Sequence, residues 1–295
     1  MPSVFSPRRR PLLGGLAAAS LALLSACASL GDAEPPPVAM KHSVVAVTDQ
    51  AELVRFNPGQ PQQWLGAPVK LQGLAAGERL LGIDFRISRG VLFGLTSGGR
   101  LVTIDTASGR LSPVGSGAPL ALPGGGGGRY GFDFNPAADR VRVVAEDGSN
   151  LRLHPDTGAV AATDPNLRYA EGDARAGQAP RVTAAGYTYN KRDDKLTTNY
   201  ALDIAAGSLV MQGSLEGTTP VVSPNTGLLR TVGALGTGAV DDAAFDIADV
   251  DNTALAALRV GGRTRLHRVD LATGRATLLG TVGQGRALWG MAIEP

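Results

Sequence analysis

The sequence predicts an all-β fold: a β-propeller of five four-stranded blades, closed by a C-terminal strand that joins N-terminal strands. Three observations lead to this prediction. A short apolar motif recurs five times, each of its first four copies is followed by three more short apolar stretches, and the chain begins without the motif but ends with it. Four short strands per repeat, at a spacing of about 45–60 residues, are typical of propeller blades.

The recurring motif has the pattern of a short β-strand. It opens with glycine or alanine, and apolar or aromatic residues then occupy alternate positions, which is the period of a strand. We expect this strand to be the innermost one of each blade, next to the central axis. The copies are GIDF at 82–85, GFDF at 131–134, GYTY at 186–189, AFDI at 244–247 and GMAI at 290–293.

The stretches after each motif have the pattern of the outer strands of a blade. After the first copy they are VLFGLT at 91–96, RLVTIDTASG at 100–109 and RLSPVG at 110–115. Asp at the start of a turn accepts backbone N–H groups and Gly at its end takes a positive φ, so such turns join antiparallel strands as hairpins. The third copy is irregular, and LDIAAG at 202–207 and SPNTG at 223–227 share this turn role.

The two ends of the chain together supply one blade. HSVVAVTD at 42–49, AELVRFNP at 51–58 and QQWLGAPVKL at 62–71 give three strands, and LWGMAIEP at 288–295 gives the fourth. A shared blade removes the exposed sheet edge and locks the ring. We therefore assign 42–295 to a single β-propeller domain. A six-bladed ring, with the long third copy split in two, and an open array are the alternatives.

The N-terminus has the pattern of a lipoprotein signal peptide over residues 1–26. Three arginines at 8–10 precede an apolar run at 12–26 that is too short to span a bilayer. The sequence LSAC at 24–27 resembles a bacterial lipobox, and Cys27 is the only cysteine in the chain, so it has no partner for an intramolecular disulfide. We expect Cys27 to be lipidated. An ordinary cleaved signal with an incidental cysteine is the alternative.

The flanking residues predict where the protein is sent. The pair Arg9-Arg10 also fits a twin-arginine signal, which would mean export in the folded state. Residues 27–41 are small, polar and proline-rich, and we expect them to form a tether after the lipidated cysteine. The absence of Asp after Cys27 resembles the enterobacterial signal for the outer membrane. We expect an outer-membrane-anchored lipoprotein of the bacterial cell envelope, facing the periplasm or the surface.

The charge of the mature chain argues against a nucleic-acid partner. The whole chain carries 28 basic and 26 acidic residues, but three of the basic residues lie in the signal peptide, which has no acid. Without them, 25 basic residues stand against 26 acidic ones. A nucleic-acid site needs concentrated Lys and Arg, so we expect no nucleic-acid partner.

Three long stretches resemble the bacterial domain-of-unknown-function family 4394. The sequence GFDFNPAADRVRVVAEDGSNLRLHPDTG within residues 131–177 matches the family's GFDFNP, NLR and NPDTG pattern, and residues 82–109 and 245–283 match two further stretches. The chain has His154 where Asn is usual, and LRY at 167–169 where LNY is common. The resemblance implies repeats and export, and it implies no established activity.

Aspartate recurs at one position of the motif and is the first candidate site. Asp84, Asp133 and Asp246 occupy it, with Thr188 and Ala292 in the other two copies. Carboxylates that converge on an axis could hold a structural Ca²⁺, or could act as acid and base on a glycan. The structural alternative is that each buried carboxylate accepts backbone N–H groups of a neighbouring blade. We otherwise expect no cofactor and no His- or Cys-based metal site.

Arginines in the second copy form another candidate site. Arg140, Arg142 and Arg152 fall on adjacent strands, near Glu146 and Asp156. Arg142 is the arginine that we assign as a candidate contact for an anionic ligand. A solvated, salt-bridged strand face is the alternative interpretation.

The predicted function is a binding or scaffold module of unknown specific activity. It would bind a small molecule, a glycan or an envelope protein, and the lipid anchor would attach it to the membrane. A hydrolase or lyase that uses channel carboxylates on a glycan or lactone is the alternative. We assign no catalytic residue, because no nucleophile–base pair or G-x-S-x-G motif is present in the sequence.

Overall fold

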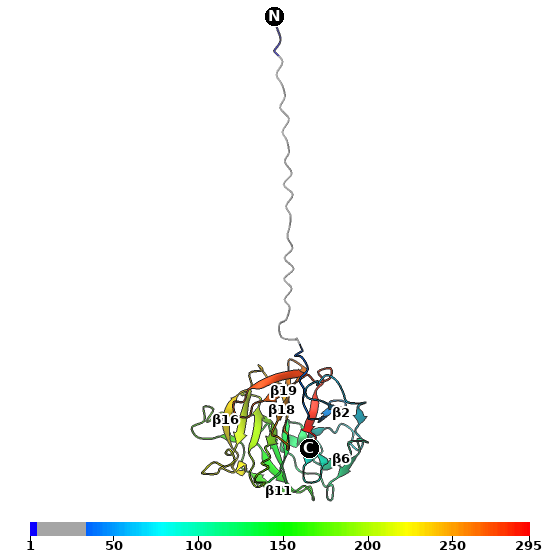
Figure 1. Ribbon diagram of the computed structural model, residues 1–295, viewed down its shortest axis with the longest axis vertical. Coiled ribbons are helices and arrows are strands. Elements are labelled where there is room, and N and C mark those ends of the chain that lie inside the picture. The colour runs from blue at the N-terminus through cyan, green and yellow to red at the C-terminus, as the bar shows by residue number, and fades with distance from the viewer. Residues whose placement is uncertain (5–33) are drawn as a thin grey trace. The chain divides into compact units, whose positions relative to one another are not determined.

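The computed structural model, which describes residues 1–4 and 34–295, contains the predicted five-bladed propeller (Figure 1). The described residues hold 21 β-strands and two short 3₁₀ helices. No helix among the described residues has the length and hydrophobicity that crossing a membrane would require. The lipobox and Cys27 lie outside the described residues, so lipidation stays a prediction.

The chain ends share a blade, as predicted. Strand β21 pairs antiparallel with β1, which puts the last strand of the chain on the inner side of the first sheet. This composite blade has the order β21-β1-β2-β3 and closes the ring. Its strands are β1 (Val44–Thr48), β2 (Glu52–Phe56), β3 (Val69–Lys70) and β21 (Leu288–Ile293).

Two blades follow the composite blade in sequence order. Each is a four-stranded antiparallel meander, because each strand pairs with the next one along the chain. The first consists of β4 (Leu80–Arg86), β5 (Val91–Thr96), β6 (Leu101–Ile104) and β7 (Leu111–Pro113). The second consists of β8 (Tyr130–Asn135), β9 (Arg140–Ala145), β10 (Asn150–Leu153) and β11 (Val160–Asp164).

The last two blades include the irregular third copy. Its sheet has four meander strands and a short fifth strand, β12, which pairs parallel with β16 at the outer edge. SPNTG at 223–227 is a 3₁₀ helix rather than a hairpin turn. The strands are β12 (Arg168–Tyr169), β13 (Val182–Tyr187), β14 (Asn199–Asp203), β15 (Ser208–Gln212) and β16 (Leu228–Ala234), then β17 (Asp242–Ile247), β18 (Ala254–Val260), β19 (Arg263–Val269) and β20 (Ala276–Thr281).

The innermost strands pack side by side around the axis, and glycine permits this approach. Strands β21, β4, β8, β13 and β17 contact one another in that cyclic order. A Cβ atom on Gly82 would lie 2.4 Å from the Cβ of Phe132, and one on Gly131 would lie 2.7 Å from the backbone nitrogen of Ala185. The glycine that opens the motif is therefore required by the neighbouring blade.

The hydrophobic core consists of five layers, one between each pair of adjacent blades. One layer differs from the others. Between the β8–β11 blade and the β12–β16 blade, Val144 is the only residue from strands β8–β11 among the buried apolar residues of that layer. Polar side chains take the remaining positions of this interface, and they form the second candidate site described below.

Candidate functional site

Three aspartates of the inner strands meet at the axis. Asp84 lies on β4, Asp133 on β8 and Asp246 on β17, and all three are buried. One carboxylate oxygen from each lies within 4.8 Å of the others. The sequence prediction that these residues share one height around the channel is therefore correct.

Each of these carboxylates accepts a backbone N–H group from the next blade around the ring, as the structural interpretation predicted. The bonds are inter-blade contacts between residues distant in sequence, and charged acceptors make such bonds strong. They join Phe134 N–H to Asp84 at 2.7 Å, Tyr187 N–H to Asp133 at 2.7 Å and Ile293 N–H to Asp246 at 2.5 Å.

Two of the aspartates also accept an N–H group of their own blade, which the preceding blade leaves unbound because it has no aspartate. The N–H of Phe85 donates to the second oxygen of Asp84 at 2.7 Å, and the N–H of Ile247 donates to the second oxygen of Asp246 at 2.6 Å. These are the inner-strand groups that the composite and β12–β16 blades would otherwise have to satisfy. Among the described residues, three carboxylates thus satisfy one inner N–H group in each of five blades, and only Oδ1 of Asp133 accepts no backbone N–H.

The position without aspartate in the β12–β16 blade is Gly186, two residues before the predicted Thr188. In the other blades, the N–H that binds the neighbouring carboxylate follows the aspartate position, and in this blade that N–H belongs to Tyr187. The prediction of Thr188 was wrong because the equivalent of GIDF in this blade is AAGY at 184–187, so the glycine of GYTY at 186 stands at the aspartate position and not at the start of the motif.

The environment of the three aspartates favours their protonated forms. Burial, and then the charge of Asp246, raises the pKa of Asp84 well above its usual range, and burial followed by the charge of Asp84 does the same to the pKa of Asp133. Carboxylate oxygens of Asp84 and Asp133 lie within 4.8 Å of each other, so ionisation of one disfavours ionisation of the other. Burial also raises the pKa of Asp246 to about 6 and that of Asp249, which lies beside them, to about 7.

The size of the axial cavity limits its chemistry. The cavity lined by the aspartates has a volume of about 10 Å³, close to the space that a single water occupies. A sugar ring does not fit, so the glycan-cleaving interpretation loses its site. The three oxygens could still hold a small ion such as Ca²⁺, in competition with the proton and the N–H groups that they already bind.

A larger cavity lies where the β8–β11 and β12–β16 blades meet. Its volume is about 330 Å³, within the range of small-molecule pockets. Strands β9 and β10 supply arginines, and the segment 213–225 between β15 and β16 supplies most of the opposite wall. Its charged lining residues are Arg140, Arg142, Arg152, Lys195 and Glu216, and its larger apolar ones are Leu196, Leu215, Val221, Val222 and Pro224.

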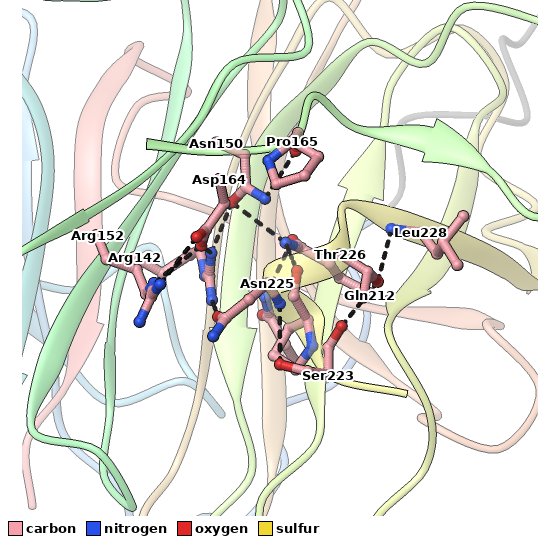
Figure 2. A network of polar contacts seen from close by, with 12 residues as sticks. Arg142, Asn150, Arg152, Asp164, Pro165, Gln212, Ser223, Asn225, Thr226 and Leu228 are labelled. Atoms are coloured by element: carbon pink, nitrogen blue, oxygen red, sulfur yellow. Dashed lines mark hydrogen bonds and ion pairs between the residues drawn. The ribbon is translucent and has the colours of Figure 1, made fainter. Parts of the chain in front are cut away.

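Arg142 lies at this cavity with 1% of its surface exposed. Its guanidinium donates to four oxygens, so the buried charge is paired and hydrogen-bonded (Figure 2). The acceptors are Tyr187 Oη at 3.0 Å from Nε, Asn150 Oδ1 at 2.7 Å and Asp164 Oδ2 at 2.8 Å from Nη1, and Asn225 Oδ1 at 2.6 Å from Nη2.

Arg152 is paired with the same carboxylate but reaches solvent. Its Nε and Nη2 each donate to Asp164 at 2.9 Å, and this pairing raises the pKa of Arg152. Its side chain is 31% exposed, against 1% for that of Arg142. Arg142 and Arg152 are direct cross-strand partners, so Asp164 separates two like charges that would otherwise face each other.

The acidic neighbours predicted for these arginines are wrong. Glu146 pairs with Arg129 and Arg181, and Asp156 pairs with Arg86 and Arg89. The solvated strand face was also the wrong interpretation for Arg142. Both faces of a propeller blade pack against neighbouring blades, so a polar residue on either face of β9 can be covered.

Sequence reasoning missed most residues of this site. They include Asn150, Asp164, Tyr187, Lys195, Glu216 and Asn225, which come from separate segments of the chain. Asn225 lies in the 3₁₀ helix Pro224–Thr226, whose N-terminus is capped by the Ser223 hydroxyl. The available signal was the strand RVRVVA at 140–145, because an arginine among the three valines and the alanine of a buried strand requires a nearby acid.

The comparison with protein families gives one match over most of the chain. The family described as "Domain of unknown function (DUF4394)" matches residues 52–292. None of the curated proteins matches the chain.

Solved structures resemble the chain at low sequence identity. A chain of a nidogen/laminin complex is 11% identical, with 86% of this chain and 98% of that chain covered and a TM-score of 0.46. A protein of unknown function from Bacteroides thetaiotaomicron is 13% identical, with 84% and 60% covered and a TM-score of 0.46. PorZ of Porphyromonas gingivalis is 15% identical, with 84% and 28% covered and a TM-score of 0.37. Likenesses at this level carry no inference about ligand or activity.

Proposed function

Because the chain belongs to the DUF4394 family, a domain of unknown function, we propose a function from its own geometry: it is a binding protein that captures a small molecule between two of its blades. The observation that carries this proposal is the 330 Å³ cavity with the buried Arg142 network in its wall.

The polar network around Arg142 is a less stable way to join two blades than an apolar core, because its buried charges lose their hydration. A core layer of packed apolar side chains would hold two blades together, as it does at the four other blade interfaces. Here two guanidinium groups share the single carboxylate of Asp164. A buried excess of charge is unfavourable by itself, and a bound anion would compensate it.

Binding is favoured over turnover by the lining of the cavity. Glu216 is its one carboxylate among the described residues, and both oxygens accept hydrogen bonds, from Thr188 Oγ1 and Asn190 Nδ2, each at 3.0 Å. Hydrolysis of a glycan needs two positioned carboxyl groups. The cavity therefore supplies charge and shape for a ligand, without an acid–base pair.

We propose that this binding protein acts at the cell envelope, exported by its signal peptide and held by a lipid on Cys27. The support is the sequence alone: the basic and apolar segments, the lipobox-like LSAC at 24–27 and the single cysteine. A tethered receptor or scavenger would meet its ligand outside the cytoplasm.

The test is a ligand screen read against two arginine variants. The full chain would be screened with small metabolites by thermal shift, and hits would be measured by isothermal titration calorimetry. Arg152→Gln removes a charge from the cavity, while Arg181→Gln removes a charge of a surface pair with Glu146. A hit whose affinity falls in the first variant only supports the proposal. Hits that bind both variants as well as the wild type would overturn it.

A further inference from the structure

The larger cavity has a charged side and an apolar side, and this division defines a class of ligand. We infer that the cavity binds a short organic carboxylate whose carboxylate group lies against Arg152 and whose apolar body lies against Leu215 and Val221. The inference rests on the proposed function and adds the chemistry of the ligand to it.

The charge of the cavity requires an anion. Four cationic side chains line it, with one lining carboxylate, Glu216, and one paired carboxylate behind the wall, Asp164. Both acids already accept hydrogen bonds from the protein. The surplus is positive, so a neutral ligand would leave it uncompensated while a small anion would reduce it.

Of the two arginines that pair with Asp164, Arg152 has the larger number of free donors. Arg142 uses four of its N–H groups within the protein and acts as a positioning residue that fixes Asp164 and Tyr187. Arg152 uses only Nε and one N–H of Nη2, both toward Asp164. Within the described part of the chain, its Nη1 and the ammonium of Lys195 have no partner. A guanidinium edge of this kind matches the planar, two-oxygen geometry of a carboxylate.

The opposite wall of the cavity is apolar and would contact an apolar part of the ligand. Leu215 is 48% exposed and Val221 is 77% exposed, although both line the cavity. They belong to the segment 213–223, which has no regular strand. Large apolar side chains exposed together at a cavity mark a binding surface. Covering them with the ligand body would remove apolar area from water, at about 25 cal/mol per Å².

The volume limits the ligand to a small molecule. At about 330 Å³, the cavity lies near the lower end of the usual range of about 300–1,000 Å³. A carboxylate with one ring or a short alkyl chain is of the right size. An extended oligosaccharide or a peptide strand is too large.

Four probes test the assignment by calorimetry on the full chain. Phenylacetate has both features, 2-phenylacetamide is its neutral isostere, acetate lacks the apolar body, and phenyl phosphate has a different anion. We expect phenylacetate to bind at least about tenfold more tightly than each of the others, a difference of about 1.4 kcal/mol. Equal binding of the amide would overturn the charge assignment, and tighter binding of phenyl phosphate would overturn the carboxylate.

Single-residue variants test which side chains contact the carboxylate end and the apolar end of the ligand. Arg152→Gln should abolish the preference for phenylacetate over the amide, and Arg152→Lys should keep part of it, while Arg181→Gln should change nothing. Leu215→Ser should weaken phenylacetate and leave acetate unchanged. Thermal unfolding checks that each variant is folded. A preference that survives Arg152→Gln would overturn the inference.

The proposed function can survive a failure of this inference. If no probe binds but a compound from the metabolite screen does, and that compound is lost in Arg152→Gln, the ligand class is wrong and the binding site stands. If every ligand found is insensitive to Arg152→Gln, both are wrong.

Discussion

The carboxylate of Asp246 accepts the backbone N–H of Ile293 at 2.5 Å, across 47 residues of sequence. Ile293 ends β21, the strand that completes the composite blade, and Asp246 lies on the inner strand of the blade before it. The bond therefore closes the ring at the point where the chain ends. It complements the β21–β1 pairing, which joins the two chain ends within one sheet.

The hydrogen bonds at the axis predict that the same substitution destabilises the protein at one aspartate and not at another. Asp246→Asn places an amide NH₂ against one of two backbone N–H donors, and an unsatisfied buried donor costs about 1–3 kcal/mol. Asp133→Asn keeps the oxygen that accepts the Tyr187 N–H and puts its NH₂ toward Asp84. We expect the first variant to lose about 1–3 kcal/mol of unfolding free energy and the second to lose none.

Urea unfolding at pH 5 measures this difference. That pH lies below the pKa of about 6 for Asp246, so the folded wild type bears little buried charge there, and relief of charge burial does not mask the lost acceptor. Asp241→Asn, at an exposed residue, is the control. Equal losses of unfolding free energy in Asp246→Asn and Asp133→Asn would contradict the hydrogen-bond assignment at the axis.

The stability of the propeller should fall as the pH rises from about 4 to above 7. Burial, aided by the charge of Asp246, raises the pKa of Asp249 from 3.8 to about 7. Between these values the folded state holds a proton that the unfolded state has released, so stability decreases with pH across the window and then levels off.

Asp249→Asn removes this share of the pH dependence. We expect the variant to be more stable than the wild type at pH 8 and equal to it near pH 4, as measured by urea unfolding at several pH values. Asp251→Asn is a poor match, since its carboxylate caps Thr253, so Asp241→Asn again serves as the control. A difference that stays constant with pH would contradict the assignment.

Calcium should have little effect on this protein. Five of the six oxygens of Asp84, Asp133 and Asp246 already accept backbone N–H groups, and burial raises the pKa of all three carboxyl groups, which favours a proton over a cation. We expect the melting temperature in millimolar CaCl₂ to equal that in EDTA. A cation at ten times its Kd would add about 1.4 kcal/mol, so a rise of several degrees that Asp133→Asn abolishes would show a calcium site.

The fold could be predicted because its signals are local. The motif GIDF at 82–85 carries three of them: a glycine that the neighbouring Phe132 requires, apolar residues at alternate positions, and an aspartate for the next blade. Strand β5 has the predicted bounds 91–96, since turns containing Gly90 and Gly99, both with positive φ, delimit it. Closure by the last strand followed from the count of strands at the two chain ends.

The second site could not be predicted because its contacts are long-range. Arg142 meets Asp164 across 22 residues and Asn225 across 83 residues. A single sequence contains no information about which of 26 acidic residues will pair with a given arginine. The two-residue error at Gly186 has a local cause, because AAGY at 184–187 lacks the opening glycine of the motif and the glycine two residues later imitates it.

The segment before the first strand is docked on the propeller through Glu34. Its carboxylate accepts the backbone N–H of Thr281 at 2.8 Å and also the hydroxyl of the same residue. Further along, the N–H of Val38 donates to the oxygen of Gly59 at 3.1 Å. We expect Glu34→Ala to cost about 1 kcal/mol and to speed hydrogen exchange in β20. Glu171→Ala, at an exposed residue, should do neither, and unchanged exchange in β20 would contradict the docking.

If Cys27 is lipidated, its sulfur atom is required for the protein to stay with the membrane. A thioether-linked lipid on the Cys27 sulfur would hold the protein in the membrane fraction of the producing bacterium, because buried acyl chains contribute about 0.8 kcal/mol per CH₂ group. Cys27→Ser should abolish labelling by a fatty-acid analogue and release the protein into the soluble fraction, as measured by fractionation and mass spectrometry. Ser29→Ala, two residues later, is the matched control and should keep both the label and the membrane association. A wild-type protein that is cleaved, unlabelled and soluble would show that the signal is an ordinary one and that the cysteine is incidental.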